Sequence, residues 1–372
     1  MRGTMRLISI DALKVGMIIG RTIWNEAGHP LIQQGMTISP GILNRLKQLN
    51  IKYMYIDDEL SKGIEIEETV PVHVRQKIVS NITQSFEGIR KMEAKKASLV
   101  LDKQTKLLNF LVDDLLDSIL NSKEILTVLT DAYLYDEYIY QHSFQVALYA
   151  LAIGRELGHN ATELHVIGLG AILHDIGKML VPSELLQKPT RLTDTEFEEV
   201  KQHTRHGFDI LRNLHTMSLI IAHCAFQHHE RLDGSGYPRG LVDFEIHPYA
   251  KIIAVADVFD AMTSNRVYRA KMMPVQALEI IENGKGTLYD TKVVEALKRT
   301  VVHYPNGSIV LLNDKRRGVI SRQNTATPTM PWVRVFEENG ELLPATYEMN
   351  LQEHSRVSIA TIDLAYTLAS DK

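Results

Sequence analysis

The stretch HHERLDGSGYPRG, residues 228–240, places two adjacent histidines and a glutamate directly before a glycine-rich loop. Histidine is the commonest metal ligand among the side chains. Glycine adopts positive φ without steric cost, so Gly234 and Gly236 let a ligand come close to the backbone. We therefore expect metal ligands beside a substrate-binding loop in this part of the chain.

The motif LHDIGK, residues 173–178, offers a second set of candidate ligands. His174 supplies a neutral ring nitrogen, and the two oxygens of Asp175 suit a bridge between two cations. Three residues on, Lys178 returns to roughly the helix face of Asp175. Burying these charges without a ligand would be costly. The alternative interpretation is a helix-end salt bridge between Asp175 and Lys178.

Other predicted helices carry side chains of the same kind. His142 precedes the LHDIGK motif, His203 follows it, and Asp257 comes later in AVADVFDA. Helical bundles build metal sites from inward-facing side chains on neighbouring helices. The set contains no sulfur, which disfavours structural zinc and favours iron or manganese. Because the candidates outnumber the ligands of one tetrahedral ion, we expect two divalent metal ions.

Two metal ions about 3.5–4 Å apart are suited to the hydrolysis of phosphate esters. Such ions generate hydroxide at neutral pH and stabilise charge on both the attacking and the leaving oxygen. Of the 15 histidines in the chain, 11 lie between His142 and His247. This enrichment marks the region as the one that carries the site.

The elements that must position these residues are mostly helical, so the predicted fold class is mainly α. Residues 130–304 show helical periodicity, and the expected helices are 136–157, 161–177, 194–213, 216–230, 247–264, 274–283 and 290–303. The flanking regions are a small α+β module over 1–60, a charged connector and helical segment over 61–129, and a small β domain over 305–372.

The module over 1–60 is open to two interpretations, a docking or dimer module and a ligand sensor. Apolar residues in the segment over 61–129 recur at helical spacing and indicate a core-facing stripe. This stripe is also a candidate surface for a homodimer, as is the N-terminal module. What regulates the protein is left open by the sequence.

Composition excludes several classes of protein. The net charge of −4 gives no indication of nucleic-acid binding or of attraction to an anionic membrane. The longest apolar runs, such as residues 146–154, are about half the length that spans a bilayer. Cys224 is the only cysteine, which rules out an internal disulfide and fits a reducing compartment. We expect a cytoplasmic protein.

The motifs, taken in order, resemble the HD-GYP branch of the HD phosphohydrolase superfamily over about residues 130–304. The matching positions are His142-Ser143, His174-Asp175-Ile176-Gly177-Lys178, His203, His228-His229-Glu230, Asp233-Gly-Ser-Gly-Tyr237-Pro238 and Asp257. The segment FDAMTSNRVYR, residues 259–269, is also similar to the family. The resemblance implies an all-helical HD-type bundle.

The resemblance also implies a cyclic di-GMP phosphodiesterase that produces linear pGpG and, in some members, GMP. Carried over by position, the metal ligands would be His142, His174, Asp175, His203, His228, His229 and Asp257. Asp175 would bridge the metals, and Lys178 would meet the scissile phosphate. The substrate wall would contain Gly234, Gly236, Tyr237, Arg266 and Arg269.

Several residues keep an alternative interpretation. Arg266 and Arg269 would otherwise be ordinary surface charges, and Glu230 is either a support for the site or an exposed helix-end acid. Asp260 is expected to orient a neighbour rather than bind metal, and Cys224 to be a small core residue.

Two rival functions remain open at this stage. One is a catalytically inactive cyclic di-GMP receptor or scaffold, which would be expected to lack a ligand or the GYP loop. The other is an HD hydrolase of another nucleotide, either a different cyclic dinucleotide or an alarmone. The intact GYP loop disfavours the alarmone, whereas guanine and adenine are not distinguished by these residues.

The metal count follows from the residues before His142. Trinuclear members of the family carry a carboxylate one helical turn before this first histidine. Here that position is Tyr138, and Glu137 lies five residues before His142. A phenol stays neutral at pH 7 and is a poor substitute for a carboxylate. We therefore predict a binuclear site with pGpG as the main product.

Overall fold

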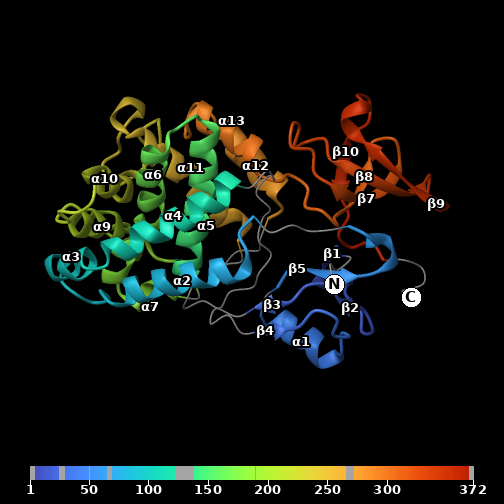
Figure 1. Cartoon of the computed structure of the whole chain (residues 1–372), viewed down its shortest axis with the longest axis horizontal. Helices are drawn as coiled ribbons and strands as arrows, with labels where there is room; N and C mark the ends of the chain where they lie inside the picture. Colours follow the sequence, from blue (N-terminus) through green and yellow to red (C-terminus); the bar gives the residue numbers. More distant parts are fainter. Residues whose placement is uncertain are drawn as a thin grey trace.

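The computed structural model describes residues 5–24, 30–49, 51–64, 69–121, 138–188, 190–264 and 272–367. A helical body occupies one side of the molecule, and the two ends of the chain form β-containing modules on the other side (Figure 1). The predicted fold class is therefore confirmed. The boundaries proposed for the four regions stay a prediction.

The N-terminal module combines short strands with one helix. Its elements are β1 (Arg6–Ser9), β2 (Ile18–Ile19), β3 (Ile23–Trp24), β4 (Pro30–Ile32), α1 (Pro40–Gln48) and β5 (Tyr53–Asp57). The strands pair in the orders β1-β5-β2 and β3-β4. The hydroxyl of Ser39 accepts from the backbone N–H of Ile42, and Pro40 begins α1, so this helix has a capped N-terminus.

Three helices connect this module to the helical body, α2 (Val72–Glu87), α3 (Ala94–Asp102) and α4 (Thr105–Asn121). The stripe predicted to face a core is fully buried at Ile78, Ile82 and Phe86. These side chains pack in the same cluster as Phe144 of α5 (Tyr138–Glu156). At the end of α2, Tyr140 donates to Glu87, and Arg90 donates to Tyr140 at 2.9 Å, which ties the connector to α5.

The helical body comprises α5 (Tyr138–Glu156), α6 (Ala161–Leu173), α7 (Ser183–Leu186), α8 (Asp194–Lys201), α9 (His203–Leu211), α10 (Leu219–Gln227), α11 (Pro248–Thr263), α12 (Pro274–Asn283) and α13 (Thr291–Thr300). Helix α5 packs against both α6 and α11, while α9 packs against α10. The α5 residues from Gln141 to Leu151 are all buried, so this helix runs through the centre of the body.

Two expected helices differ from the structure. The helix expected over 161–177 ends at Leu173, and a 3₁₀ turn follows over Ile176–Leu180. Gly177 in this turn lies so close to α9 that an added Cβ would be 1.9 Å from the carbonyl oxygen of His203. A regular α-helix would carry the chain away from this contact. The helix expected over 194–213 is divided into α8 and α9 at Gln202.

The C-terminal module is a sheet of antiparallel strands, β6 (Ile309–Leu312), β7 (Arg316–Arg322), β8 (Trp332–Glu338), β9 (Glu341–Asn350) and β10 (Ile359–Ile362). The strand order is β10-β6-β7-β8-β9. Asn339 and Gly340 turn β8 into β9 with φ of 51° and 88°. Asn-Gly is the favoured pair for such a turn because both residues tolerate positive φ.

The two ends of the chain pack against each other, which the sequence did not indicate. The backbone N–H of Leu7 donates to Gly307 at 2.9 Å, and that of Ser9 donates to Leu364 at 2.9 Å. Leu7 and Tyr55 also share an apolar cluster with Leu364.

Charged side chains line the same interface, which we call the terminal junction and define by Arg6, Asp58, Arg317, Glu337 and Tyr366. Arg6 is 1% exposed and pairs with Asp58, and its Nη1 donates to the carbonyl oxygen of Tyr366 at 2.9 Å. Arg317 pairs with Glu337, which also accepts from the hydroxyl of Tyr366 at 2.9 Å.

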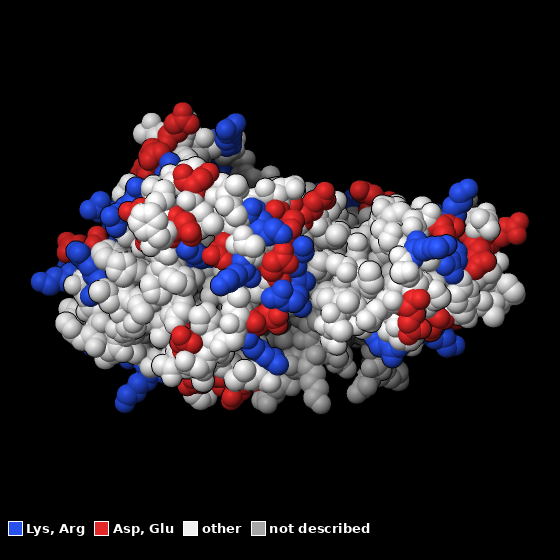
Figure 2. Space-filling model, turned by 90° about the horizontal axis from the view of Figure 1, so that it is seen from above, with Lys and Arg blue, Asp and Glu red and all other residues white. Residues whose placement is uncertain are grey.

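None of the described helices has the length and apolar composition needed to cross a membrane. On the face shown in Figure 2, acidic and basic side chains are interspersed among uncharged ones over the described part of the chain.

Candidate metal centre

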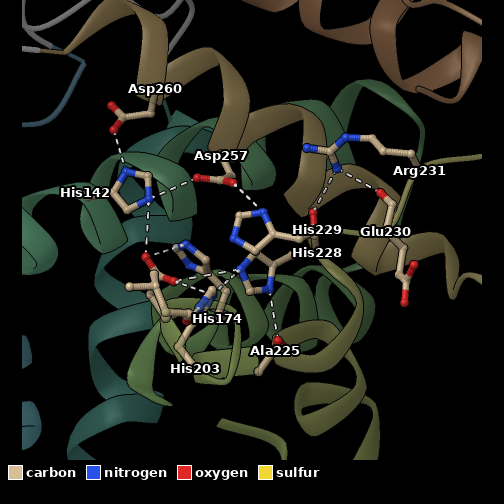
Figure 3. Close-up of polar contacts among 12 residues, drawn as sticks. His142, His174, His203, Ala225, His228, His229, Glu230, Arg231, Asp257 and Asp260 are labelled. Carbon is tan, nitrogen blue, oxygen red and sulfur yellow. Dashed lines mark hydrogen bonds and ion pairs between the residues drawn. The ribbon is translucent and has the colours of Figure 1, made fainter. Parts of the chain in front are cut away.

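The predicted ligands come from α5, α9 and α11 and from the segments that follow α6 and α10, and they meet in one place (Figure 3). They form two adjacent groups, one of Asp175, His203, His228 and His229, and the other of His142, His174 and Asp257. Within each group the ligand atoms lie within 4.8 Å of one another. The structure thus brings together every residue of the predicted ligand set, and their role as ligands stays a prediction.

The carboxylate of Asp175 lies between the groups and faces both of them. Its Oδ1 is 3.4 Å from Nε2 of His203 and 3.8 Å from Nε2 of His228. Its Oδ2 is 3.4 Å from Nε2 of His174 and 3.6 Å from Nε2 of His142. Each oxygen therefore faces a different pair of imidazoles, as a bridging carboxylate would.

Asp257 provides a second link between the groups. Its Oδ1 lies 3.1 Å from Nε2 of His142, and its Oδ2 lies 3.7 Å from Nδ1 of His229. Asp257 comes from α11, whereas Asp175 follows α6. The two carboxylates therefore approach the histidines from different helices.

Three of the imidazoles are oriented by backbone carbonyl groups three residues earlier. Nδ1 of His174, His203 and His228 donates to Ala171, Val200 and Ala225 at 2.7, 2.7 and 3.0 Å, respectively. With the proton on Nδ1, the lone pair on Nε2 points into the cluster, which is the orientation that a metal ligand requires. The sequence reasoning did not anticipate these contacts.

His142 is oriented by a carboxylate instead. Its Nδ1 lies 2.6 Å from Oδ2 of Asp260, whose Oδ1 accepts from the hydroxyl of Ser264 at 2.7 Å. Asp260 is 0% exposed and lies on the far side of His142 from the other groups (Figure 3). The prediction that Asp260 orients a neighbour is confirmed.

The protonation states of the group formed by Asp175, His203, His228 and His229 suit a cation. Burial by itself would raise the pKa of Asp175, but Lys178 and His174 hold it well below its usual range. Burial lowers the pKa of His203 to about 4. Burial and the neighbouring imidazoles also hold the pKa values of His228 and His229 well below their ordinary value. At pH 7 these residues therefore present anionic oxygens and neutral nitrogens.

Two buried atoms in the cluster lack a hydrogen-bond partner within the described part of the chain, Nε2 of His174 and Oδ1 of Asp175. Leaving buried polar atoms unpaired costs about 1–3 kcal/mol each. Divalent cations bonded to these atoms would remove this cost. The residues therefore fit divalent metal ions, with nitrogen and oxygen ligands only.

Lys178 lies at the edge of the cluster. Its ammonium group pairs with Oδ2 of Asp175, so the alternative interpretation of this pair as a salt bridge has a structural basis. The side chain of Lys178 is 20% exposed, whereas that of Asp175 is 1% exposed. The ammonium group therefore lies between the buried carboxylate and the solvent.

The glycine-rich loop packs its aromatic residue directly onto the cluster. The ring of Tyr237 stacks on His229 with centroids 4.6 Å apart and planes at 29°. Gly234 has a φ of 81°, and an added Cβ on Gly236 would be 2.4 Å from the Cα of Glu230. Both glycines are thus required by the path of the loop.

Glu230 fixes this loop. Its carboxylate accepts from the backbone N–H groups of Arg239 at 2.8 Å and Leu241 at 2.9 Å. The residue is 3% exposed, so the interpretation of Glu230 as an exposed helix-end acid is wrong. It supports the site by holding the loop that carries Tyr237.

Gly177 is a residue whose role the sequence reasoning missed. An added Cβ would lie 1.9 Å from the carbonyl oxygen of His203 and 2.4 Å from the backbone nitrogen of Gly207. Glycine therefore lets the turn after Asp175 reach the start of α9, where His203 lies. The glycine within the LHDIGK motif was the feature of the sequence that could have indicated this close approach.

Three residues singled out from the sequence lie outside the described residues, namely Glu137, Arg266 and Arg269. The expectations that rest on them, the metal count and the arginine contacts with substrate, stay predictions.

The chain is similar to known phosphodiesterases. A family model described as HD domain matches residues 122–293. A cyclic di-GMP phosphodiesterase of Pseudomonas aeruginosa is 30% identical over 355 residues, which cover 89% of this chain and 85% of that protein.

Two further relatives are matched over less of their length. A cyclic di-GMP phosphodiesterase of Thermotoga maritima is 36% identical over 64% of this chain and 64% of its own. A 3'3'-cGAMP-specific phosphodiesterase of Vibrio cholerae is 38% identical over 44% of this chain and 36% of its own. The chain therefore spans less than two thirds of either protein.

Proposed function

The chain belongs to the HD-GYP family of HD-domain phosphodiesterases, and we propose that it hydrolyses cyclic di-GMP to linear pGpG at the cluster around Asp175. The observation that carries this proposal is the position of that carboxylate, whose two oxygens face different pairs of imidazoles. The named relatives with the highest coverage act on cyclic di-GMP, which supports the choice of substrate.

We propose two divalent ions, either iron or manganese. One would be held by His203, His228 and His229, the other by His142, His174 and Asp257, and both would share Asp175. Divalent ions bound there would lower the pKa of a water molecule and neutralise negative charge on the phosphate. The seven ligand positions of the family pattern are all occupied by suitable residues here, which disfavours the inactive receptor.

Around these ions, the chain's own residues would position the substrate. The ammonium group of Lys178 pairs with the proposed bridging carboxylate of Asp175. When substrate binds, this ammonium group would release Asp175 and pair with the scissile phosphodiester instead. Tyr237, held against His229, would form one wall for the dinucleotide. Arg266 and Arg269 are proposed to contact guanine or phosphate, because Arg offers charge and a flat face together.

A second candidate substrate is 3'3'-cGAMP, because one relative of similar identity is specific for it. Cyclic di-GMP and cGAMP differ in one purine, and the metal cluster would bind phosphate rather than a base. The choice between them therefore depends on the substrate wall rather than on the cluster.

The test is to purify the chain with and without oxygen, quantify its bound metals and incubate each preparation with both dinucleotides. We expect about two iron or manganese ions per chain and conversion of cyclic di-GMP to pGpG, with little GMP. Preferential hydrolysis of cGAMP would make cGAMP, rather than cyclic di-GMP, the assigned substrate. Metal-loaded protein that hydrolyses neither dinucleotide would contradict the proposed function. The homodimer predicted from the sequence is also open, and light scattering of the same preparation measures it.

A further inference from the structure

Helix α8 brings two side chains to the loop that carries Tyr237. The aromatic ring of Phe197 is directed at the ring of Tyr237, with centroids 6.3 Å apart and planes at 78°. Phe197 is nevertheless 45% exposed, which is unusual for a large aromatic side chain beside a polar cluster. Helix α8 carries none of the site residues predicted from the sequence.

These rings continue a row that starts at the cluster. His229 stacks on Tyr237, and Tyr237 contacts the edge of Phe197. The row therefore leads from a proposed metal ligand to the solvent. A planar group bound at the metal centre would find aromatic surface along this direction.

A positive charge accompanies the aromatic row. The ammonium group of Lys201 lies 4.8 Å from the ring centre of Phe197 and 5.3 Å from that of Tyr237. It also pairs with Glu198 at 2.6 Å, a carboxylate whose side chain is 65% exposed. Exposed pairs of this kind contribute little stability, so Lys201 is able to exchange Glu198 for another anion at low cost.

The start of α8 is fixed, so these two side chains have a defined place. Thr193 and Glu196 cap the helix reciprocally, with Glu196 Oε2 accepting from the backbone N–H of Thr193 at 2.7 Å. Lys188 also pairs with Glu196, at 2.6 Å. The pair with Lys188 and the capping bonds lower the pKa of Glu196 to about 2, so this anchor persists at all ordinary pH values.

We propose that Phe197 and Lys201 form a second part of the substrate site, with the ring stacking on a purine and the ammonium group binding the phosphate that is not cleaved. This inference deepens the proposed function and rests on it. A cyclic dinucleotide has two purines and two phosphates, whereas the metal cluster accounts for one phosphate only. Stacking on an aromatic side chain and a cationic contact are the interactions that the remaining groups require.

The chain contains a matched pair elsewhere. The ammonium group of Lys77 lies 4.4 Å from the ring centre of Phe110, which is 50% exposed. These residues belong to α2 and α4, where Lys77 also pairs with Asp114 at 2.9 Å. The pair reproduces the lysine-over-phenylalanine arrangement without Tyr237 and therefore serves as a control.

The experiment compares steady-state kinetics of the metal-loaded full chain with the variants Phe197→Ala, Lys201→Ala, Phe110→Ala and Lys77→Ala. We expect the two α8 variants to raise KM for cyclic di-GMP about tenfold, with kcat within twofold and metal content unchanged. The two control variants should leave KM unchanged. Phe197→Trp and Lys201→Arg should restore most of the affinity, because they keep the ring and the charge.

A second substrate separates binding from general damage. Bis(4-nitrophenyl) phosphate is a diester without a purine or a second phosphate, so its hydrolysis should be equal in the wild type and both α8 variants. Unchanged KM for cyclic di-GMP in both α8 variants, with an active wild type, would overturn this inference and leave the proposed function intact. A metal-loaded wild type that hydrolyses the small diester but no cyclic dinucleotide would overturn the proposed function itself.

Discussion

Buried polar side chains are organised in opposite ways at the metal-ligand cluster and at the terminal junction. At the junction, donors face acceptors, since the guanidinium group of Arg6 meets Asp58 and that of Arg317 meets Glu337. In the cluster, imidazole nitrogens and carboxylate oxygens with lone pairs face one another around Asp175.

The two regions differ in the kind of atom that is left without a partner. At the junction the paired groups balance each other's charge, and the atoms left without a partner among the described residues are the N–H donors Nη2 of Arg6 and Nε of Arg317, which do not bind cations. Converging ligand atoms leave His174 Nε2 and Asp175 Oδ1 unpaired within the described part of the chain, which favours the binding of cations. Buried charge alone therefore does not identify a functional site, whereas converging ligand atoms that keep unpaired lone pairs point to one.

Two optical signals separate the regions experimentally. The only tryptophans, Trp24 and Trp332, lie in β3 and β8, one in each terminal module. Tryptophan fluorescence therefore reports the terminal modules, and far-ultraviolet circular dichroism reports mainly the helical body.

The largest expected effect comes from Asp175→Asn, which replaces one bridging oxygen by an amide nitrogen that cannot bind metal. We expect loss of at least one metal ion and a decrease in turnover of a hundredfold or more, on the order of the effect of losing a ligand from a metal site. Elemental analysis and product chromatography measure the two quantities.

The matched change at the junction is Asp58→Asn, which should keep the full metal content and turnover. Normal metal content and hydrolysis in Asp175→Asn would contradict the bridging role. Metal loss in Asp58→Asn would show that the two regions are not independent.

The next effect is on stability, through Arg6→Ala. Removing this 1% exposed side chain leaves Asp58 without its cationic partner and the carbonyl oxygen of Tyr366 without its donor. Breaking such a buried pair typically costs about 3–5 kcal/mol. Urea unfolding followed by tryptophan fluorescence should show this decrease, while the metal content stays unchanged.

The control is Arg212→Ala, which removes a surface pair with Asp209 and should cost about 1 kcal/mol or less. Equal losses in the two variants would mean that the buried junction contributes no more than a surface pair.

A smaller effect is expected from Gly177→Ala, which tests packing behind the cluster. The new methyl group would overlap the carbonyl of His203, so α9 must shift and carry His203 with it. We expect a loss of about 1–3 kcal/mol in the free energy of unfolding, typical of overpacking, together with weaker metal binding.

Gly41→Ala in α1 is the matched change in the N-terminal module, because the nearest heavy atom beyond the adjoining backbone, Oγ of Ser39, would be 3.8 Å from the added Cβ. It should be neutral or slightly stabilising. If metal affinity is unaltered in Gly177→Ala, the position of His203 does not depend on this close contact.

The smallest effect concerns Tyr55→Phe at the apolar edge of the junction. The hydroxyl of Tyr55 is buried and has no hydrogen-bond partner among the described residues, and burial raises its pKa from 10.0 to about 12. Stability linked to this raised pKa is fully present below pH 10 and is lost as the pH rises from 10 to 12.

The variant removes this titration, so the difference in unfolding free energy between variant and wild type should shift in favour of the variant over that pH range. At pH 7 we expect a change of about 1 kcal/mol or less, towards higher stability. Fluorescence-monitored unfolding at pH 7 and pH 11 measures both, and a marked loss at pH 7 would show that the hydroxyl is needed.

Much of the candidate site was predictable because ligand chemistry is carried by residue type and order along the chain. Histidines and aspartates on successive helices indicated a metal-binding bundle, and the glycine-rich loop indicated a close approach to the backbone. The core stripe of α2 was likewise evident from helical spacing, since burial of one helix face leaves a period of 3.6 residues.

Other features required the tertiary structure because they depend on contacts between distant segments. Helix α6 ends at Leu173 where Gly177 meets His203, a contact that local helix propensity does not encode. Leu7 pairs with Gly307 across almost the whole chain, and Phe197 reaches Tyr237 from a helix with no ligand of its own. The sequence by itself thus determined which side chains are available as metal ligands. The fold decided which oxygen of Asp175 faces which imidazole, because those directions are set by how the helices pack.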